Sequence, residues 1–213
     1  MNNLRKFATE ADYSAATLNY PAVSWVVSGD TVHFDKTSPV PPVVNTKVKL
    51  AFTTDTCGAG KSFPVVGDGG MFDILDGIII NGVPYVDDTC SFSIELEANT
   101  NYLIEYVLKS DVTDVSYFFN IDTPEGCSSS DYYKYDILFP AQVTNISSVH
   151  EDNSINCILF ESATPPTLHF SSSSIEFNVY APAASISAYE SAFAGQSEVN
   201  VYTLSQYNGN IPL

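Results

Sequence analysis

DILFP at residues 136–140, CILFE at 157–161 and NVYAP at 178–182 decide the predicted fold. The matching apolar residues Ile137, Ile158 and Val179 are 21 residues apart each time, and a fourth apolar stretch, 199–202, follows about one period later. A repeat of ~20–29 residues with one short strand in each copy is typical of leucine-rich and β-solenoid folds. Ordinary strands of a β-sandwich that share this spacing by chance are the alternative.

One short helix is expected between the third and the fourth of these stretches. Residues 185–193 (SISAYESAF) follow Pro182, Ser185 suits the N-cap position and Gly195 provides a stop. We therefore predict that residues 127–213 form leucine-rich or β-solenoid-like repeats that contain one short helix.

Residues 46–126 have the alternation of a half-buried antiparallel sheet. Apolar and polar residues alternate at 47–52, 92–97 and 102–108, and such alternation gives a strand one buried and one solvated face. Asn81-Gly82 is a strong signal for a two-residue hairpin turn, and Pro84 places the strand after it at an edge. We predict a β-sandwich-like module here, so the whole chain is expected to be mainly β.

The first 36 residues form a separate small segment. Residues 9–12 match a capping box and predict a helix over about 10–17, and a hairpin is expected from strands at 23–27 and 31–34. Three prolines in 37–45 (TSPVPPVVN) indicate a semi-rigid, extended linker. Because so short a segment cannot bury its own apolar face, residues 1–36 are expected to dock on something else.

Charge and composition exclude several classes of function. The 213 residues carry 8 basic and 25 acidic side chains, a net charge of −17 that repels nucleic acid and anionic membranes. Aromatic residues make up 13%, too many for a disordered acidic tail, so the chain is expected to fold. No apolar stretch reaches the ~20 residues that span a bilayer. The first ten residues lack the apolar core of a secretory signal, which predicts synthesis in the cytoplasm without export by the usual route.

The cysteines are expected to be reduced thiols. Cys57, Cys90, Cys127 and Cys157 are 30–37 residues apart and include no C-x-x-C pair. This spacing is poor for a zinc site, and a cytoplasmic origin disfavours disulfides.

No residue pattern supports catalysis or a cofactor. CGAGKS at 57–62 is half of a phosphate-binding loop, but Asp55 stands where the loop needs glycine and Phe63-Pro64 prevents the helix that should follow. The histidines, which lie in unrelated contexts, are His33, His150 and His169. The acids between 68 and 88 do not fit an EF-hand, which favours solvated side chains over a calcium site. We therefore expect no catalytic residue, no cofactor and no bound metal.

Part of the chain resembles a family of surface proteins. CILFESATPPTL at 157–168, followed by FNVYAPAASISAYESA at 177–192, resembles the C-terminal end of BspA-like leucine-rich surface proteins. In that family a strand, an A-x-x-P-P-T-L-like turn, a strand ending in V-P-A-A-S and an A-Y helix recur in this order. Residues 78–108 resemble the β module that precedes those repeats. The resemblance covers about two thirds of the chain, which departs from the family in having only about three repeats.

The N-terminus resembles a different group. LRKFATEADYSAA at 4–16, YPAVSW at 20–25 and DTVHF at 30–34 are similar to the opening of virion proteins of crAss-like phages of gut Bacteroidetes. This resemblance covers about 35 residues. It implies an attachment segment shared by proteins of one particle, followed by a variable outer module.

These features predict a structural protein of the virion, either a head-fibre or a decoration subunit anchored to the capsid by its N-terminus. The residues expected to contact other virion proteins are Leu4, Arg5, Lys6, Phe7, Tyr13, Leu18 and Trp25. A homodimer or homotrimer is expected, because a short repeat stack needs partners to cover its ends and edges.

The alternative is a tail-associated or surface adhesin module that binds host glycans or a receptor. Exposed tyrosines such as Tyr132, Tyr133 and Tyr135 would then provide the contacts. Neither nucleic acid nor a membrane is expected as a partner under either hypothesis.

Overall fold

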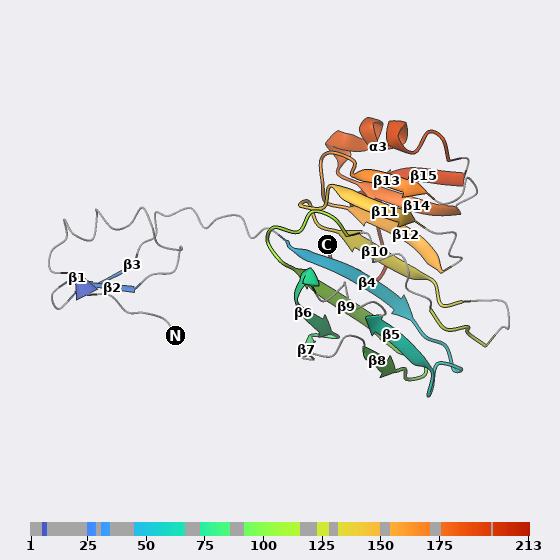
Figure 1. The fold of residues 1–213 in the computed structure, drawn as a ribbon, viewed down its shortest axis with the longest axis horizontal. Helices are drawn as coiled ribbons and strands as arrows, with labels where there is room; N and C mark the ends of the chain where they lie inside the picture. Colours follow the sequence, from blue (N-terminus) through green and yellow to red (C-terminus); the bar gives the residue numbers. More distant parts are fainter. Residues whose placement is uncertain are drawn as a thin grey trace. The chain divides into compact units, whose positions relative to one another are not determined.

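The computed structural model describes residues 6–7, 25–28, 31–34, 45–66, 73–85, 92–115, 123–127, 132–149, 154–170, 176–196 and 198–213. The chain divides into two compact units, Met1–Val44 and Asn45–Leu213. Strands dominate the described residues, which confirms the prediction of a mainly β protein (Figure 1).

The first unit contains a small three-stranded sheet. β2 (Trp25–Ser28) and β3 (Thr31–Phe34) pair antiparallel, and β1 (Lys6–Phe7) pairs parallel with β2. The helix predicted over 10–17 lies outside the described residues, as does the proline-rich stretch up to residue 44.

The second unit is built on an eight-stranded mixed sheet. In spatial order its strands are β15 (Glu198–Thr203), β14 (Glu176–Ala181), β12 (Ile155–Phe160), β10 (Tyr135–Phe139), β4 (Lys47–Thr53), β9 (Asn101–Leu108), β6 (Leu75–Ile80) and β7 (Val83–Tyr85). The first four are parallel to one another, whereas the others are joined by antiparallel pairing. Because β4 pairs with β10, the stretches 46–126 and 127–213 contribute to one sheet.

The parallel half of the sheet keeps a nearly constant register. Ile137 lies opposite Ile158, Ile158 opposite Val179, and Val179 opposite Val201. The three stretches DILFP, CILFE and NVYAP thus supply neighbouring strands. Ile137, Ile158 and Val179 are all fully buried, so equivalent positions in the sequence pattern occupy equivalent positions in the core.

The predicted hairpin and the predicted short helix are both present. Asn81 and Gly82 have positive φ angles of 49° and 81°, as a tight turn between β6 and β7 requires. β7 is the edge strand that Pro84 predicts. α3 (Ile186–Ala192) follows a 3₁₀ turn, η2 (Ala183–Ser185), and Ser185 occupies its N-cap position without a capping side-chain hydrogen bond.

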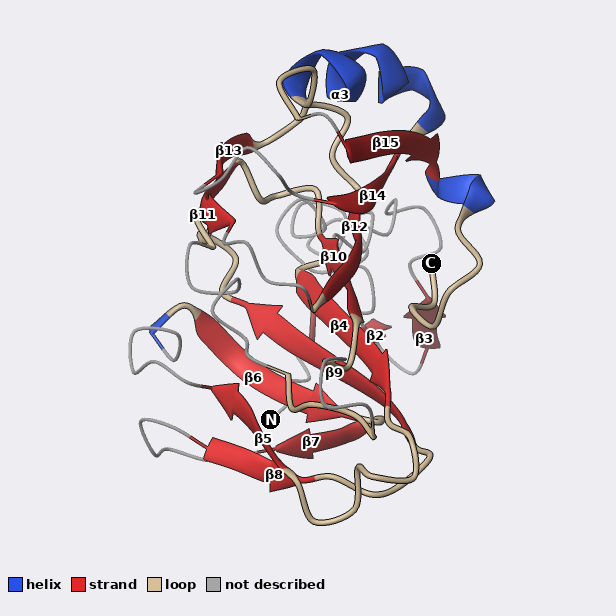
Figure 2. Ribbon diagram, turned by 90° about the vertical axis from the view of Figure 1, so that its right-hand side faces the viewer, coloured by secondary structure: helices blue, strands red, loops and turns tan. Residues whose placement is uncertain are grey.

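Shorter elements cover one face of the large sheet (Figure 2). They are α3, the antiparallel pair β5 (Ser62–Val66) and β8 (Phe92–Glu95), and the parallel pair β11 (Asn145–Val149) and β13 (Thr167–Phe170). Their buried side chains join those of the sheet in one continuous hydrophobic core. On β9 the alternate residues Tyr102, Ile104, Tyr106 and Leu108 face this core, which confirms the predicted alternation.

The C-terminal residues cover part of the opposite face. After β15 the chain forms η3 (Leu204–Gln206), and the buried Ile211 packs against Leu138, Cys157 and Leu159. Strands β10 and β12 are therefore buried on both faces. This explains why their sequences read as continuous apolar stretches instead of alternating ones.

Candidate functional site

The structure describes only part of the predicted attachment segment. Lys6 and Phe7 form β1, and Trp25 begins β2. Leu4, Arg5, Tyr13 and Leu18 lie outside the described residues. The pairing of Lys6 with Val27 brings the start of the segment beside its hairpin.

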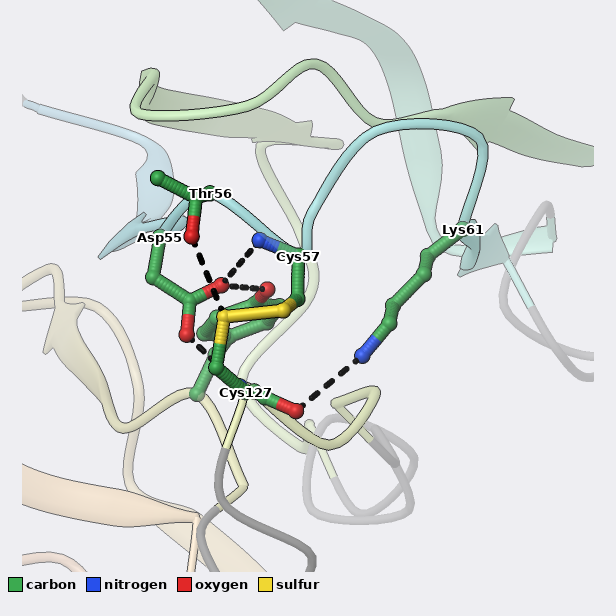
Figure 3. The surroundings of a disulfide bond; sticks show 7 residues. Asp55, Thr56, Cys57, Lys61 and Cys127 are labelled. Carbon is green, nitrogen blue, oxygen red and sulfur yellow. Dashed lines mark hydrogen bonds between the residues drawn. A yellow bond between two sulfur atoms is a disulfide. The ribbon is translucent and has the colours of Figure 1, made fainter.

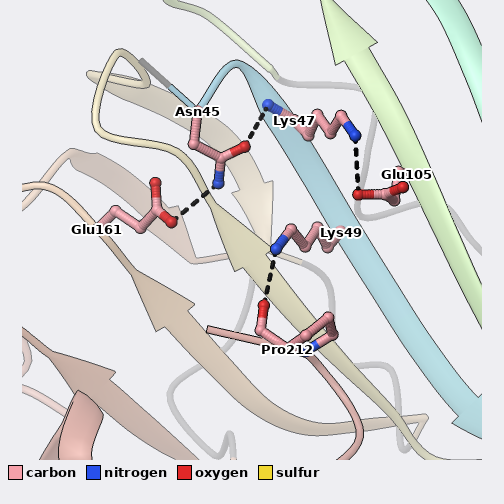
Figure 4. Close-up of polar contacts among 6 residues, drawn as sticks. All are labelled: Asn45, Lys47, Lys49, Glu105, Glu161 and Pro212. Carbon is pink, nitrogen blue, oxygen red and sulfur yellow. Dashed lines mark hydrogen bonds and ion pairs between the residues drawn. The ribbon is translucent and has the colours of Figure 1, made fainter. Parts of the chain in front are cut away.

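Asn45, the first residue of the second unit, is hydrogen-bonded to other residues of that unit (Figure 4). The Asn45 Nδ2 donates a hydrogen bond to Glu161 Oε1 at 2.8 Å, and the Lys47 amide donates to Asn45 Oδ1 at 3.2 Å. β4, which starts two residues later, is paired on both sides, with β10 and with β9. A pulling force applied to the chain before Asn45 would therefore act on β4, an interior strand of the sheet, and not on an edge strand.

Two lysines of β4 make further contacts on the face that the C-terminal residues cover (Figure 4). Lys47 forms an ion pair with Glu105 on β9 at 3.1 Å, and Lys49 Nζ donates to the Pro212 carbonyl at 2.7 Å. Both bonds join β4 to segments far away in the sequence. A partly exposed ion pair such as Lys47–Glu105 contributes at most about 1 kcal/mol to stability.

The expectation of four reduced cysteines is wrong for two of them. Cys57 and Cys127 form a disulfide across a sequence separation of 70 residues. Cys157 is a free, buried thiol, and Cys90 lies outside the described residues. The disulfide joins the turn after β4 to the segment that leads into β10, and β4 and β10 are already neighbours in the sheet. Pairing of the strands therefore brings these two sulfurs together.

Asp55 organises the loop around the disulfide (Figure 3). Its carboxylate accepts hydrogen bonds from the Tyr133 hydroxyl at 2.6 Å, the Cys127 amide at 2.7 Å and the Cys57 amide at 2.9 Å. These donors, led by Tyr133, hold the pKa of Asp55 below its usual value of 3.8. Burial, followed by the bond to Asp55, raises the pKa of Tyr133 to about 12.

This network predicts an acid-sensitive loop. A carboxylate with a lowered pKa in the folded state stabilises the protein above pH 3.8, and this contribution is lost as the pH falls through the lowered value. Asp55→Asn should therefore unfold at a lower temperature than wild type at pH 7, with the difference shrinking below pH 3.8. Thermal unfolding from pH 2 to pH 7 measures this. Asp76→Asn, which removes an exposed carboxylate, is the control and should unfold like wild type at pH 7. A constant gap between Asp55→Asn and wild type at every pH would contradict the prediction.

The glycine-rich stretch 57–62 forms a tight turn that leads into β5, so a strand follows it where a phosphate loop needs a helix. Gly60 has a φ of 75°, and a Cβ at Gly58 would lie 2.7 Å from the Thr54 Cβ. Lys61 is turned back to the Gly126 carbonyl, at 3.4 Å, and lies over the Tyr133 ring. Gly58 and Gly60 are thus required by the geometry of this turn.

The cluster of possible metal ligands among the described residues is this same site. It consists of Asp55, Cys57 and Cys127, and the disulfide removes both sulfurs as thiolate ligands. Of the acidic residues considered for calcium, Asp73 and Asp76 are exposed, and Asp68, Asp87 and Asp88 lie outside the described residues.

A second polar cluster lies under the C-terminal residues. Asp136, which is only 7% exposed, accepts hydrogen bonds from Tyr207 at 2.6 Å and from Asn156 at 2.7 Å. Burial, together with Asp136, raises the pKa of both Tyr207 and the neighbouring Cys157 thiol. A protonated, buried thiol is a poor nucleophile, so this cluster serves to hold the C-terminal residues on the sheet.

The tyrosines proposed as glycan contacts occupy different environments. Tyr132 is 42% exposed, whereas Tyr133 and Tyr135 are buried, with exposures of 6% and 0%. Tyr133 packs beside Phe52, and its hydroxyl donates a hydrogen bond to Asp55. Tyr135 is the first residue of β10. The prediction of exposed contacts is therefore wrong for Tyr133 and Tyr135. Of the histidines, His33 lies in β3 and His169 in β13, and His150 is outside the described residues.

Comparison of the chain with known protein families, with curated proteins and with solved structures finds no match. Within the part of the chain that the structure describes, no helix has the length and apolar character needed to cross a membrane.

Proposed function

We propose that this chain is a structural protein of a phage virion, a head-fibre or decoration subunit that is held by its N-terminal segment and presents residues 45–213 outward. The observation that carries the proposal is the division of the chain into Met1–Val44 and Asn45–Leu213. The first unit is small and is joined by a proline-rich stretch to a large unit that has its own core. This arrangement suits a protein in which the first unit attaches to a particle and the second is displayed by it.

Charge supports the same division of roles. Residues 1–44 contain three basic and four acidic side chains, whereas residues 45–213 contain five basic and 21 acidic ones, which gives net charges of −1 and −16. A nearly neutral segment can dock on a protein surface at little electrostatic cost, while a strongly acidic body favours contact with solvent. We accordingly place the contacts to other virion proteins in residues 1–36.

The disulfide supports a location on the outside of a particle. Disulfides persist in oxidising environments, which include virion and cell surfaces, and are rare in reducing cytoplasm. The fixed start of the second unit, where Asn45 is bonded to Glu161 and β4 lies in the middle of the sheet, also suits a module that is pulled through its N-terminus.

We also propose that residues 127–213 are a short repeat array of the BspA-like type. Parallel strands offset by 21, 21 and 22 residues support this. So does the second parallel pair, in which Asn145 of β11 lies opposite Thr167 of β13, with α3 in the corresponding place between β14 and β15. Because β7 and β15 are edge strands, we further propose that the protein works as a homodimer or homotrimer that covers these edges.

Removal of residues 1–44 tests the attachment role. The 45–213 fragment keeps the whole sheet and core, so it should unfold at the same temperature as that core does in the full chain, yet be absent from purified particles. Mass spectrometry of particles made with tagged full-length and truncated chains measures this, and Tyr132→Ala in the full chain is the control that should assemble normally. Assembly of the truncated chain at the full-length level would overturn the proposal.

A second candidate function is a surface adhesin module that binds host glycans. The buried positions of Tyr133 and Tyr135 remove two of its expected contacts. What favours this function is Tyr132, the third expected contact, which is 42% exposed.

A further inference from the structure

The loop around the disulfide places three metal-binding groups together. One carboxylate oxygen of Asp55 and the sulfurs of Cys57 and Cys127 all lie within 4.8 Å of one another. Two thiolates bound to one tetrahedral Zn²⁺ ion at about 2.3 Å are about 3.8 Å apart. After reduction of the disulfide, a single ion could therefore contact all three groups without a large movement of the loop. Cys127 is exposed, which gives a reductant and a metal ion access to the site.

The two segments that carry the sulfurs are held together by contacts that do not involve sulfur. The Asp55 carboxylate accepts hydrogen bonds from the Tyr133 hydroxyl at 2.6 Å and from the Cys127 amide at 2.7 Å. Lys61 Nζ donates to the Gly126 carbonyl at 3.4 Å. The pairing of β4 with β10 holds the same two segments from the side of the sheet. Reduction is therefore expected to leave the two thiols close to each other and to Asp55.

The groups around the sulfurs suit thiolates and a bound cation (Figure 3). Thr56 Oγ1 lies 3.2 Å from Cys127 Sγ, where its hydroxyl can donate to a thiolate. Among the described residues Asp55 Oδ2 accepts one hydrogen bond, from the Cys127 amide, so one acceptor position of this oxygen remains for a metal. One Zn²⁺ ion with two thiolates and one carboxylate has one excess negative charge, which the nearby Lys61 ammonium offsets.

We propose that Asp55, Cys57 and Cys127 form a redox-controlled site that binds Zn²⁺ when the disulfide is reduced. Thiolate ligands select Zn²⁺ over Ca²⁺ and Mg²⁺, which prefer oxygen. Asp55 supplies the third ligand, and water fills the fourth position of the tetrahedron. The site is independent of the virion role proposed above.

The metal and the cross-link are alternative states of the same two sulfurs. Two molecules of a low-molecular-weight thiol reduce the disulfide to two cysteine thiols and are themselves oxidised to one disulfide. Zn²⁺ then binds both sulfurs as thiolates, and their two protons go to solvent. The reverse exchange, with a low-molecular-weight disulfide as oxidant, restores the cross-link and releases the ion.

The test is titration of the full-length chain with Zn²⁺, and with Co²⁺ as a spectroscopic probe of thiolate ligation. A Cys90→Ser/Cys157→Ala background leaves Cys57 and Cys127 as the only cysteines, and a phosphine serves as reductant because thiols compete for the metal. The reduced chain should bind one Zn²⁺ ion with a Kd of about 1 µM, weaker than a structural site with four protein ligands. With Co²⁺ it should show thiolate-to-metal charge-transfer absorption. The oxidised chain, identical in sequence, should show neither.

Variants of the three ligands test the site residue by residue. Cys57→Ser and Cys127→Ser should each weaken Zn²⁺ binding by at least about 100-fold, because each removes a thiolate. Asp55→Asn should weaken binding by about tenfold, because it replaces a charged ligand by a neutral amide. Asp76→Asn, which removes an exposed carboxylate outside the site, is the matched control and should bind like the parent chain.

Three outcomes would overturn the site. They are the absence of Zn²⁺ binding by the reduced, folded chain, equal binding by the reduced and oxidised chains, and unchanged affinity in a folded Cys57→Ser variant. Where reduction alone unfolds the chain, circular dichroism becomes the readout. Zn²⁺ should then restore the folded spectrum, and failure to do so would also overturn the site.

Discussion

Removal of the Cys57–Cys127 disulfide should lower the free energy of unfolding by about 4 kcal/mol. The two cysteines are 70 residues apart, and a cross-link over a loop of that length strongly restricts the unfolded chain. In a unit of this size the loss corresponds to a fall in Tm of about 10 °C. The double variant Cys57→Ser/Cys127→Ser, unfolded in urea beside oxidised wild type, measures the effect.

A reductant provides the internal control for this prediction. Dithiothreitol should lower the stability of wild type to that of the double variant and leave the variant unchanged, because Cys157 is a buried thiol without a partner cysteine among the described residues. Equal urea midpoints for wild type and variant under oxidising conditions would show that the cross-link is not formed in solution.

The cysteine pairing could not be derived from the sequence alone. Four cysteines allow three pairings, and their even spacing favours none of them. The deciding contact is the antiparallel pairing of β4 with β10, where Phe52 lies opposite Tyr135. That contact joins strands that are more than 80 residues apart in the chain. Local sequence patterns do not predict which distant strands will pair.

Local patterns, by contrast, predicted the local elements correctly. The alternation in β9, the Asn81-Gly82 turn with its edge strand, and the helix α3 depend on residues close together in sequence, and all three are present. The tyrosines show the limit of this reasoning. Tyr132 and Tyr133 are adjacent and chemically identical, yet one is exposed and the other is buried against Phe52. Which of two adjacent side chains faces the core depends on how that segment packs against strands that are distant in the sequence.

A groove of about 350 Å³ between the end of α3 and the edge of β15 could not be predicted for the same reason. Tyr202 and Gln196 have no unusual sequence context, and only the return of the chain through α3 brings them to one cavity. A partial signal existed, because Tyr180 and Tyr202 follow the strand repeat at a spacing of 22 residues. Aligned tyrosines in neighbouring repeats predict a stacked pair on one face of a parallel sheet.

Phe160→Ala should also destabilise the second unit by about 4 kcal/mol, as expected for an aromatic side chain removed from a packed core. Phe160 is 1% exposed and connects three elements. Its ring centroid lies 5.8 Å from that of Phe139 on β10, 5.2 Å from that of Tyr189 on α3 and 6.5 Å from that of Phe193, just beyond α3. Loss of the ring leaves a cavity between the sheet and the helix that neither element can fill without moving.

The position of this cavity gives the prediction a second readout. Hydrogen exchange of the α3 amides should become faster in Phe160→Ala than that of the β4 and β9 amides, because α3 packs on Phe160 whereas β4 and β9 pair with each other in a different part of the sheet. Phe160→Leu, which fills part of the space, is the matched control and should lose only about 1–2 kcal/mol. A loss below about 1 kcal/mol for Phe160→Ala, or uniform acceleration of exchange over the whole sheet, would contradict the assignment of Phe160 as the contact that holds α3 on the parallel strands.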